Sequence, residues 1–169
     1  MRGWITPGLR RLTAAALLGI VALAGGRLAA AETLPVVTSF SILGDLTQQI
    51  GGDRVEVLSL VGPGADAHVY QPTPGDARRL ARAKLVVVNG LGFEGWIDRL
   101  IQSSGYRGGV VVASRGVEAM RLAGGEADRH PQHGDLDPHA WQDLANARRY
   151  VVNIATALAA VDPANRAYY

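Results

Sequence analysis

The sequence predicts an α/β fold built on a parallel four-stranded sheet with helices on both faces. Two observations carry this prediction. Short β-prone runs alternate with segments of helical spacing along residues 32–161, which is typical of βαβ units. One run within residues 84–89, Leu-Val-Val-Val, is continuously apolar, as expected for a strand buried on both faces of a sheet. The sequence contains no internal repeat of this unit.

The first predicted unit covers residues 34–61. Residues 34–38 and 55–61 are β-prone runs and are predicted strands. Between them, residues 41–50 place Leu43, Leu46 and Ile50 on one face of a helix. A loop containing glycine and proline follows the second strand.

The second helix is predicted from a capping pattern. Thr73 can cap it, Pro74 suits its first position, and Asp76 lies three residues after the cap. The strand within residues 84–89 follows it. The residues expected in register on the helix are Ala77, Leu80, Ala81 and Lys84.

The remaining elements are a helix, a strand and a longer helix. Residues 94–104 are expected to be helical with Ile97, Leu100 and Ile101 inward, and residues 110–113 form the fourth strand. After a polar loop at 124–138, Asp143 can cap the last helix. Its residues at helical spacing are Leu144, Ala147, Val151, Ile154, Ala155, Leu158 and Val161.

The first 31 residues have the pattern of a signal peptide. Arg2, Arg10 and Arg11 precede an apolar run over residues 12–24, and small residues follow up to Ala31. The apolar run is shorter than the roughly 20 residues that a membrane-spanning helix needs. We therefore expect cleavage after Ala31 and export to the periplasm.

Composition is that of a folded, exported protein. The 169 residues are 48% hydrophobic and 19% charged, enough for one domain with its own core. The first 31 residues hold four of the 17 basic residues and none of the 15 acidic ones, which leaves 13 basic and 15 acidic residues. This balance argues against binding to nucleic acid. The sequence has no cysteine that could carry a lipid anchor.

Two histidines follow different predicted strands. His68 comes after the second strand and His139 after the fourth, within Asp137–Trp141. Parallel strands place their carboxyl ends at one edge of the sheet, where ligands bind in open α/β folds. Two neutral imidazoles there are part of a site for a borderline metal such as Zn(II). The alternative is a pair of unrelated surface histidines.

The polar loop before His139 offers further possible ligands. A solvated loop is the simpler interpretation, and weak metal capture is the alternative, because ordering a loop opposes tight binding. The side chains concerned are Glu126, Asp128, His130, His133 and Asp135.

Catalytic motifs are absent from the sequence, and we predict that the chain is not an enzyme. There is no G-x-S-x-G or H-E-x-x-H motif, and residues 90–92, Gly-Leu-Gly, lack the third glycine of a dinucleotide site. Trp96 and Trp141 are expected to pack in the core or at an interface. Two alternatives remain: a periplasmic zinc hydrolase with Glu94 or Asp137 as general base, and a binding module for a non-metal ligand.

Six segments, taken in order, resemble the metal-receptor family of zinc and manganese ABC transporters, whose two lobes are joined by one long helix. The segments are Val36–Phe40, Asp66–Pro74, Asn89–Trp96, Asp137–Trp141, Asn153–Ala155 and Asp162–Asn165.

This resemblance implies a metal receptor and names its ligands. His68 and His139 would be the ligands from the first lobe, residues 32–161 of a two-lobed solute-binding protein. Residues 162–169 would begin the linking helix, so that the chain holds only the N-terminal half. The protein, a monomer, would capture a divalent ion and deliver it to the membrane permease of an ABC transporter. Imidazole ligands favour zinc over manganese as the transported ion.

Overall fold

A computed structural model of the chain describes residues 32–122 and 135–169. The expected signal peptide, residues 1–31, lies outside this part of the chain, as do His130 and His133. Residues Thr33–Tyr169 form one structural unit. Within the described ranges, no helix combines the length and the apolar character that crossing a membrane requires.

The centre of this unit is a parallel sheet of four strands, which confirms the predicted fold class. The strand order is β2-β1-β3-β4, and every neighbouring pair is parallel. All four residues of β3 are buried, because this strand has a neighbour on each side and helices on both faces. The strands are β1 (Leu34–Phe40), β2 (Val55–Val61), β3 (Leu85–Val88) and β4 (Gly109–Val112).

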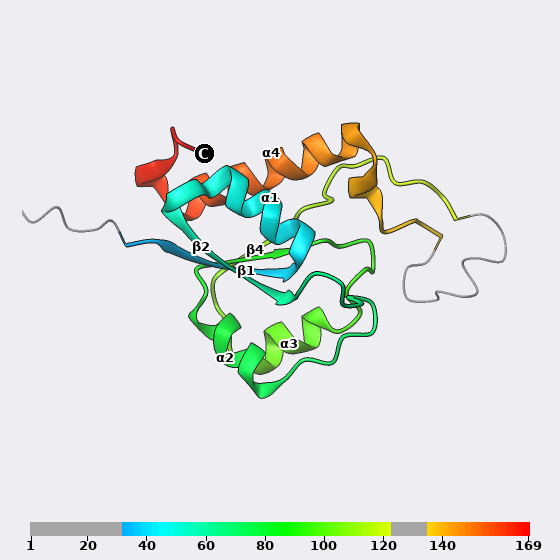
Figure 1. Cartoon of the computed structure of the whole chain (residues 1–169), viewed down its shortest axis with the longest axis horizontal. Helices are drawn as coiled ribbons and strands as arrows, with labels where there is room; N and C mark the ends of the chain where they lie inside the picture. Colours follow the sequence, from blue (N-terminus) through cyan, green and yellow to red (C-terminus); the bar gives the residue numbers. More distant parts are fainter. Residues whose placement is uncertain (1–31, 123–134) are drawn as a thin grey trace, which may run out of the picture. The chain divides into compact units, whose positions relative to one another are not determined.

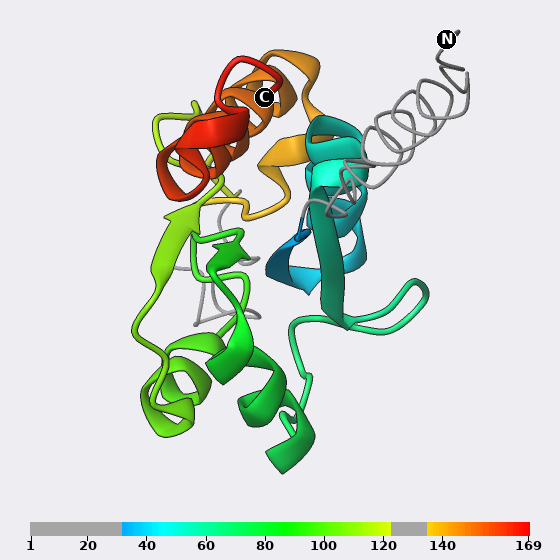
Figure 2. The same ribbon diagram turned by 90° about the vertical axis from the view of Figure 1, so that its left-hand side faces the viewer.

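In residues 32–122 and 135–169, α-helices cover both faces of the sheet (Figure 1). α1 (Ser41–Gly51) and α4 (Leu144–Val161) pack side by side on one face, and α2 (Pro74–Arg82) and α3 (Ile97–Ser104) pack together on the other. Figure 2 shows the same two layers after a quarter turn. Short 3₁₀ turns are formed by Gly52–Arg54, Ala140–Gln142 and Pro163–Asn165.

Side-chain caps set the starts of α2 and α4, as the sequence predicts. Thr73 Oγ1 accepts from the backbone N–H of Asp76, and Asp76 Oδ2 accepts from the N–H of Thr73 at 2.8 Å, which completes a capping box. Asp143 Oδ1 accepts from the N–H of Asn146 at 2.9 Å.

The predictions for α2 and α3 are wrong at two helix ends. α2 ends at Arg82, so Lys84 lies outside the helix, and Ala81 is exposed. α3 begins at Ile97 rather than at residue 94. The reason is that Glu94 is buried in the turn before the helix, where it accepts hydrogen bonds from backbone amides.

The inner face of α4 is also different from the predicted one. Tyr150, Ile154 and Leu158 are fully buried, whereas Leu144 and Val151 are exposed. The sequence pattern missed Tyr150 because its hydroxyl is polar. In the structure that hydroxyl donates to the side chain of Asn89, at the end of β3.

The strand order creates a switch point between β1 and β3. The chain passes from β1 to β2 on one side, and β3 then lies on the other side of β1. Loops that leave the carboxyl ends of β1 and β3 therefore diverge, and such a point is where open α/β sheets bind ligands.

An antiparallel bridge lies ahead of His139, between Arg121 and Leu136. The N–H of Leu122 donates to the carbonyl of Asp135 at 2.9 Å. The N–H of Asp137 donates to the carbonyl of Met120 at 2.8 Å. The bridge therefore brings together the two chain positions that flank residues 123–134.

Candidate metal site

His68 lies in a tight turn after β2. Its backbone N–H donates to Oδ1 of Asp66 at 2.8 Å, which is the hydrogen bond of an Asx turn. Ala67, between the two, is buried, and His68 is half-buried. The turn thus buries Ala67 and leaves the imidazole of His68 at the carboxyl edge of the sheet.

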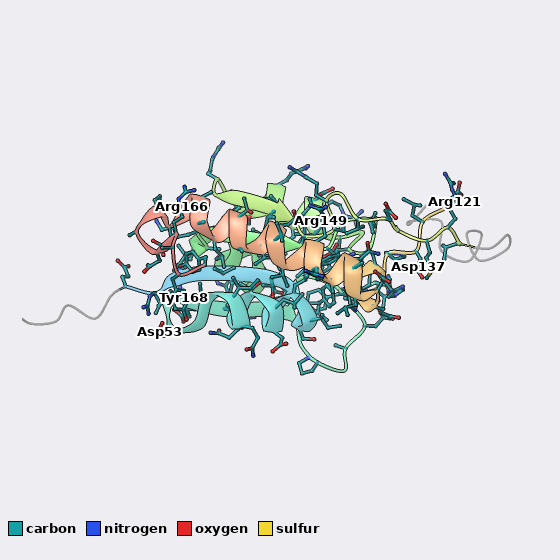
Figure 3. All side chains as sticks on the ribbon, turned by 90° about the horizontal axis from the view of Figure 1, so that it is seen from above. Asp53, Arg121, Asp137, Arg149, Arg166 and Tyr168 are labelled. Carbon is teal, nitrogen blue, oxygen red and sulfur yellow. The ribbon has the colours of Figure 1, made fainter. Side chains whose placement is uncertain are left out.

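His139 lies in a second turn of the same kind. Its backbone N–H donates to Oδ1 of Asp137 at 2.9 Å, and its ring Nδ1 lies 2.7 Å from the same oxygen. A carboxylate accepts, so Nδ1 carries the proton and Nε2 presents its lone pair. Metal-binding histidines are commonly oriented in this way. Figure 3 shows Asp137 at the end of the unit opposite Asp53 and Tyr168.

The two imidazoles meet at their Nε2 atoms, which are 3.2 Å apart. Their ring centroids are 5.2 Å apart at an interplanar angle of 62°. Because Nε2 of His139 is the acceptor, Nε2–H of His68 donates to it when no ion is bound. Two nitrogens bound at about 2.0–2.1 Å to one tetrahedral zinc ion lie about 3.3 Å apart. The rings therefore have the spacing of two ligands to one ion.

Aromatic rings surround the imidazole pair. The Phe93 centroid lies 4.4 Å from that of His68 and 5.6 Å from that of His139. Trp141 packs on His139 at 5.3 Å and on Phe93 at 5.0 Å. These edge-on contacts limit the orientations that the two imidazoles can adopt.

Glu94 lies behind the site, where it is almost fully buried. Its carboxylate accepts from Ser39 Oγ at 2.5 Å, from the N–H of Asn89 at 2.6 Å and from the N–H of Gly90 at 3.2 Å. Burial raises the pKa of Glu94, and these hydrogen bonds offset only part of that rise. With both oxygens engaged inside the protein, Glu94 is not available as a general base.

The structure brings together two of the four histidines named from the sequence. His68 and His139 meet at the carboxyl edge, and their role as metal ligands stays a prediction. His130 and His133 lie outside the described residues. Among residues 32–122 and 135–169, no group of three or more His, Cys, Asp or Glu could hold a metal ion.

The sequence analysis did not predict that Phe93 packs against both imidazoles, nor that Asp137 contacts the ring of His139. A signal for the second was present, because Asp-x-His occurs at residues 66–68 and again at 137–139. Trp96 is buried and Trp141 is half-buried against the core, so the predicted packing role of both is confirmed.

Residues 36–169 match the family model described as ZnuA, zinc-uptake complex component A, periplasmic. The chain belongs to this family. ZnuA-family proteins are solute-binding components of metal ABC transporters and not enzymes, which confirms the predicted class. Membership of this family argues against the hydrolase alternative.

Curated relatives in the ZnuA family carry the names of several metals. The manganese ABC transporter substrate-binding lipoprotein PsaA of Streptococcus pneumoniae is 37% identical over 166 residues, covering 94% of this chain and 52% of that protein. The iron-binding protein YfeA of Yersinia pestis is 37% identical over 168 residues, with the same coverage of both chains. The chain thus spans about half the length of the curated relatives it matches.

Solved structures support the fold assignment within the ZnuA family. A Mn-bound periplasmic metal-binding protein from Candidatus Liberibacter asiaticus superimposes with a TM-score of 0.71 at 34% identity, over 81% of this chain and 49% of that one. Zn(II)-bound AdcA from Streptococcus pneumoniae gives 0.67 at 25% identity, over 81% and 28%. The described unit therefore corresponds to one lobe of these solute-binding proteins.

Proposed function

We propose that this chain provides one lobe of a receptor that captures a divalent transition-metal ion outside the cytoplasm and delivers it to the permease of an ABC transporter. His68 and His139 are the ligands from this lobe. The observation that carries the proposal is the 3.2 Å separation of their Nε2 atoms at the carboxyl edge of the sheet.

The other ligands come from outside this pair. Two imidazoles cannot complete a four-coordinate site, and the described residues offer no group of three ligands. Since the curated relatives are about twice as long, a second lobe is the natural source. Residues 32–161 then form the first lobe, residues 162–169 lead toward the second, and residues 1–31 direct export.

Zinc is the ion that we propose for this site. Imidazole suits Zn(II) well, whereas Mn(II) stands at the bottom of the affinity order for divalent first-row metals. The relatives are named for manganese and iron as well as zinc. Ligands beyond the imidazole pair can therefore change the preference, and a half-site with water in the other positions should favour zinc.

Calorimetric titration of the 169-residue chain with zinc and with manganese tests this proposal. We expect zinc to bind more tightly than manganese, and the double variant His68→Ala/His139→Ala to lose binding. Gln102→Ala, an exposed change on α3, serves as the control and should bind as the unmodified chain does. Equal affinity of the double variant and the unmodified chain would remove the site assignment.

A further inference from the structure

The segment between β3 and α3 contacts both histidine turns. We call residues 89–96 the β3–α3 brace. Nε1–H of Trp96 donates to the carbonyl of Ala67 at 2.8 Å, and Nδ2 of Asn89 donates to the carbonyl of Pro138 at 2.9 Å. Both hydrogen bonds are buried. In each turn the brace therefore holds the carbonyl of the residue directly before the histidine.

Asn89, the first residue of the brace, forms hydrogen bonds through its side-chain amide and its backbone carbonyl. It is fully buried, and its Oδ1 accepts from the hydroxyl of Tyr150 at 2.7 Å. Its backbone carbonyl accepts from Ser114 Oγ at 2.6 Å. Nδ2 faces two carbonyls, those of Gly90 and Pro138, which identifies it as the nitrogen of the amide.

Trp96, at the other end, is also buried and oriented by its neighbours. Its ring packs against that of Tyr70 at 5.1 Å and 61°. The residue occupies the N-cap position of α3, so the helix sets the place of its backbone. The indole N–H is thereby presented to the first histidine turn.

The backbone between these two ends has an uncommon conformation. Gly90, Leu91 and Gly92 have φ values of 85°, 55° and 74°, three left-handed residues in a row. A side chain at Gly90 would also collide with Val112. The two glycines adopt this conformation without steric cost, whereas at Leu91 it is uncommon and persists because the surrounding structure enforces it. Here it reverses the chain and places Phe93 against both imidazoles.

We propose that Asn89 and Trp96 are positioning residues that set the separation of the two imidazoles. This inference rests on the proposed function, in which His68 and His139 bind one ion. Each donor fixes the peptide plane that enters a histidine, and rotation of that plane would displace the imidazole. Because both donors belong to one brace, the spacing depends on a single segment and not on two independent loops.

The variant Trp96→Phe tests the first donor. It keeps an aromatic ring next to Tyr70, and it removes the N–H together with part of the buried indole ring. Tyr106→Phe is the control, since its hydroxyl donates at 2.7 Å to the carbonyl of Gly109, the first residue of β4. We expect Trp96→Phe to bind zinc about 10-fold more weakly, as when outer partners of metal ligands are removed. The visible absorption spectrum of the cobalt-loaded protein should also change.

The variant Asn89→Ala tests the second donor. Its matched control is Asn153→Ala, because Nδ2 of Asn153 donates to the carbonyls of Ala113 at 2.7 Å and Arg115 at 2.9 Å. We expect weaker zinc binding and an altered cobalt spectrum for Asn89→Ala alone. Thermal unfolding of the metal-free variants separates this effect from general destabilisation, which both asparagine changes produce.

Two outcomes overturn the inference, and they are distinguishable. If the unmodified chain binds zinc through its histidines and Trp96→Phe keeps its affinity and cobalt spectrum, the positioning role is wrong and the proposed function stands. If the unmodified chain binds no zinc, the proposed function fails and the inference fails with it. Should Asn89→Ala not fold, the comparison of Trp96→Phe with Tyr106→Phe decides.

Discussion

The two histidine turns share a pattern but hold their imidazoles in different ways. In residues 137–139, one carboxylate oxygen of Asp137 contacts both the backbone N–H and the ring Nδ1 of His139. In residues 66–68, Asp66 accepts from the backbone N–H of His68. One carboxylate thus orients a ring, and the other shapes a turn.

The residues that follow His68 are anchored by hydrogen bonds to the carboxylate of Asp76. The Tyr70 hydroxyl donates to Oδ2 of Asp76 at 2.9 Å, and Thr73 donates to the same oxygen through its N–H and its hydroxyl, at 2.8 and 2.7 Å. The two turns thus fix an imidazole in place in different ways: one orients the His139 ring directly, and the other anchors the chain that follows His68. The two arrangements predict different consequences when each is removed.

The largest effect should come from the imidazoles themselves and should be equal on the two sides. His68→Ala and His139→Ala each remove one of two ligands, so each should weaken zinc binding by more than the roughly 10–100-fold typical of outer partners. Calorimetry on both single variants measures this. If one variant binds zinc normally, the two turns do not share an ion.

Replacing the carboxylates of Asp137 and Asp66 should affect zinc affinity unequally. Asp137→Asn keeps the shape of the residue but weakens the hold on the ring, and we expect zinc affinity to fall about 10-fold. Asp66→Asn should have a clearly smaller effect, because the backbone N–H can still donate to the amide oxygen. Titration of the two variants under identical conditions compares them directly. Equal losses would mean that ring orientation is not the difference between the turns.

The anchor at Asp76 should affect stability more than binding. Asp76→Asn disturbs the capping box of α2, and we expect a loss of about 1–2 kcal/mol in the free energy of unfolding. Zinc affinity should change less than in Asp137→Asn. Denaturant unfolding of the metal-free protein measures the first effect and calorimetry the second. A binding defect as large as that of Asp137→Asn would show that loop anchoring positions His68 as strongly as ring orientation positions His139.

The contribution of Asp76 should also depend on pH. Burial acts to raise the pKa of Asp76, but hydrogen bonds from Thr73 and Tyr70 and the charge of Arg79 leave it below its ordinary value. A lowered folded-state pKa stabilises the protein fully above the unfolded pKa of about 4 and is lost as pH falls through the folded value. The stability difference between Asp76→Asn and the unmodified chain should therefore be constant from about pH 7 to 5 and shrink below about pH 4. A difference that shrinks between pH 7 and 5 would contradict this assignment.

The smallest effect is expected in the polar loop. Replacing His130 and His133 by alanine should leave the zinc affinity of the His68–His139 pair nearly unchanged, because ordering a loop opposes tight binding. Competition with a zinc-sensitive dye would detect the change. A large loss would make these residues ligands in their own right.

Local signals in the sequence were sufficient for the order of the strands, the helix caps and the edge at which the histidines meet. They were not sufficient for all strand ends, since β1 extends to Phe40 and β4 begins at Gly109. The capping box at Thr73 and the cap at Asp143 depend on neighbours three residues away and were predicted correctly. The brace was not predicted, because its contacts join residues 29 and 49 positions apart. The buried face of α4 was misjudged for the same reason, since Tyr150 has a partner 61 residues away.

The bridge between Arg121 and Leu136 has a practical consequence for protein engineering. It joins the chain before residue 123 to the chain after residue 134, directly ahead of the second histidine turn. The entropic cost of closing a connection between two fixed points grows only slowly with its length, by about 0.6 kcal/mol for each doubling. A reporter peptide inserted between residues 122 and 135 would thus be tethered close to His139, while other parts of the chain maintain the geometry of the imidazole pair.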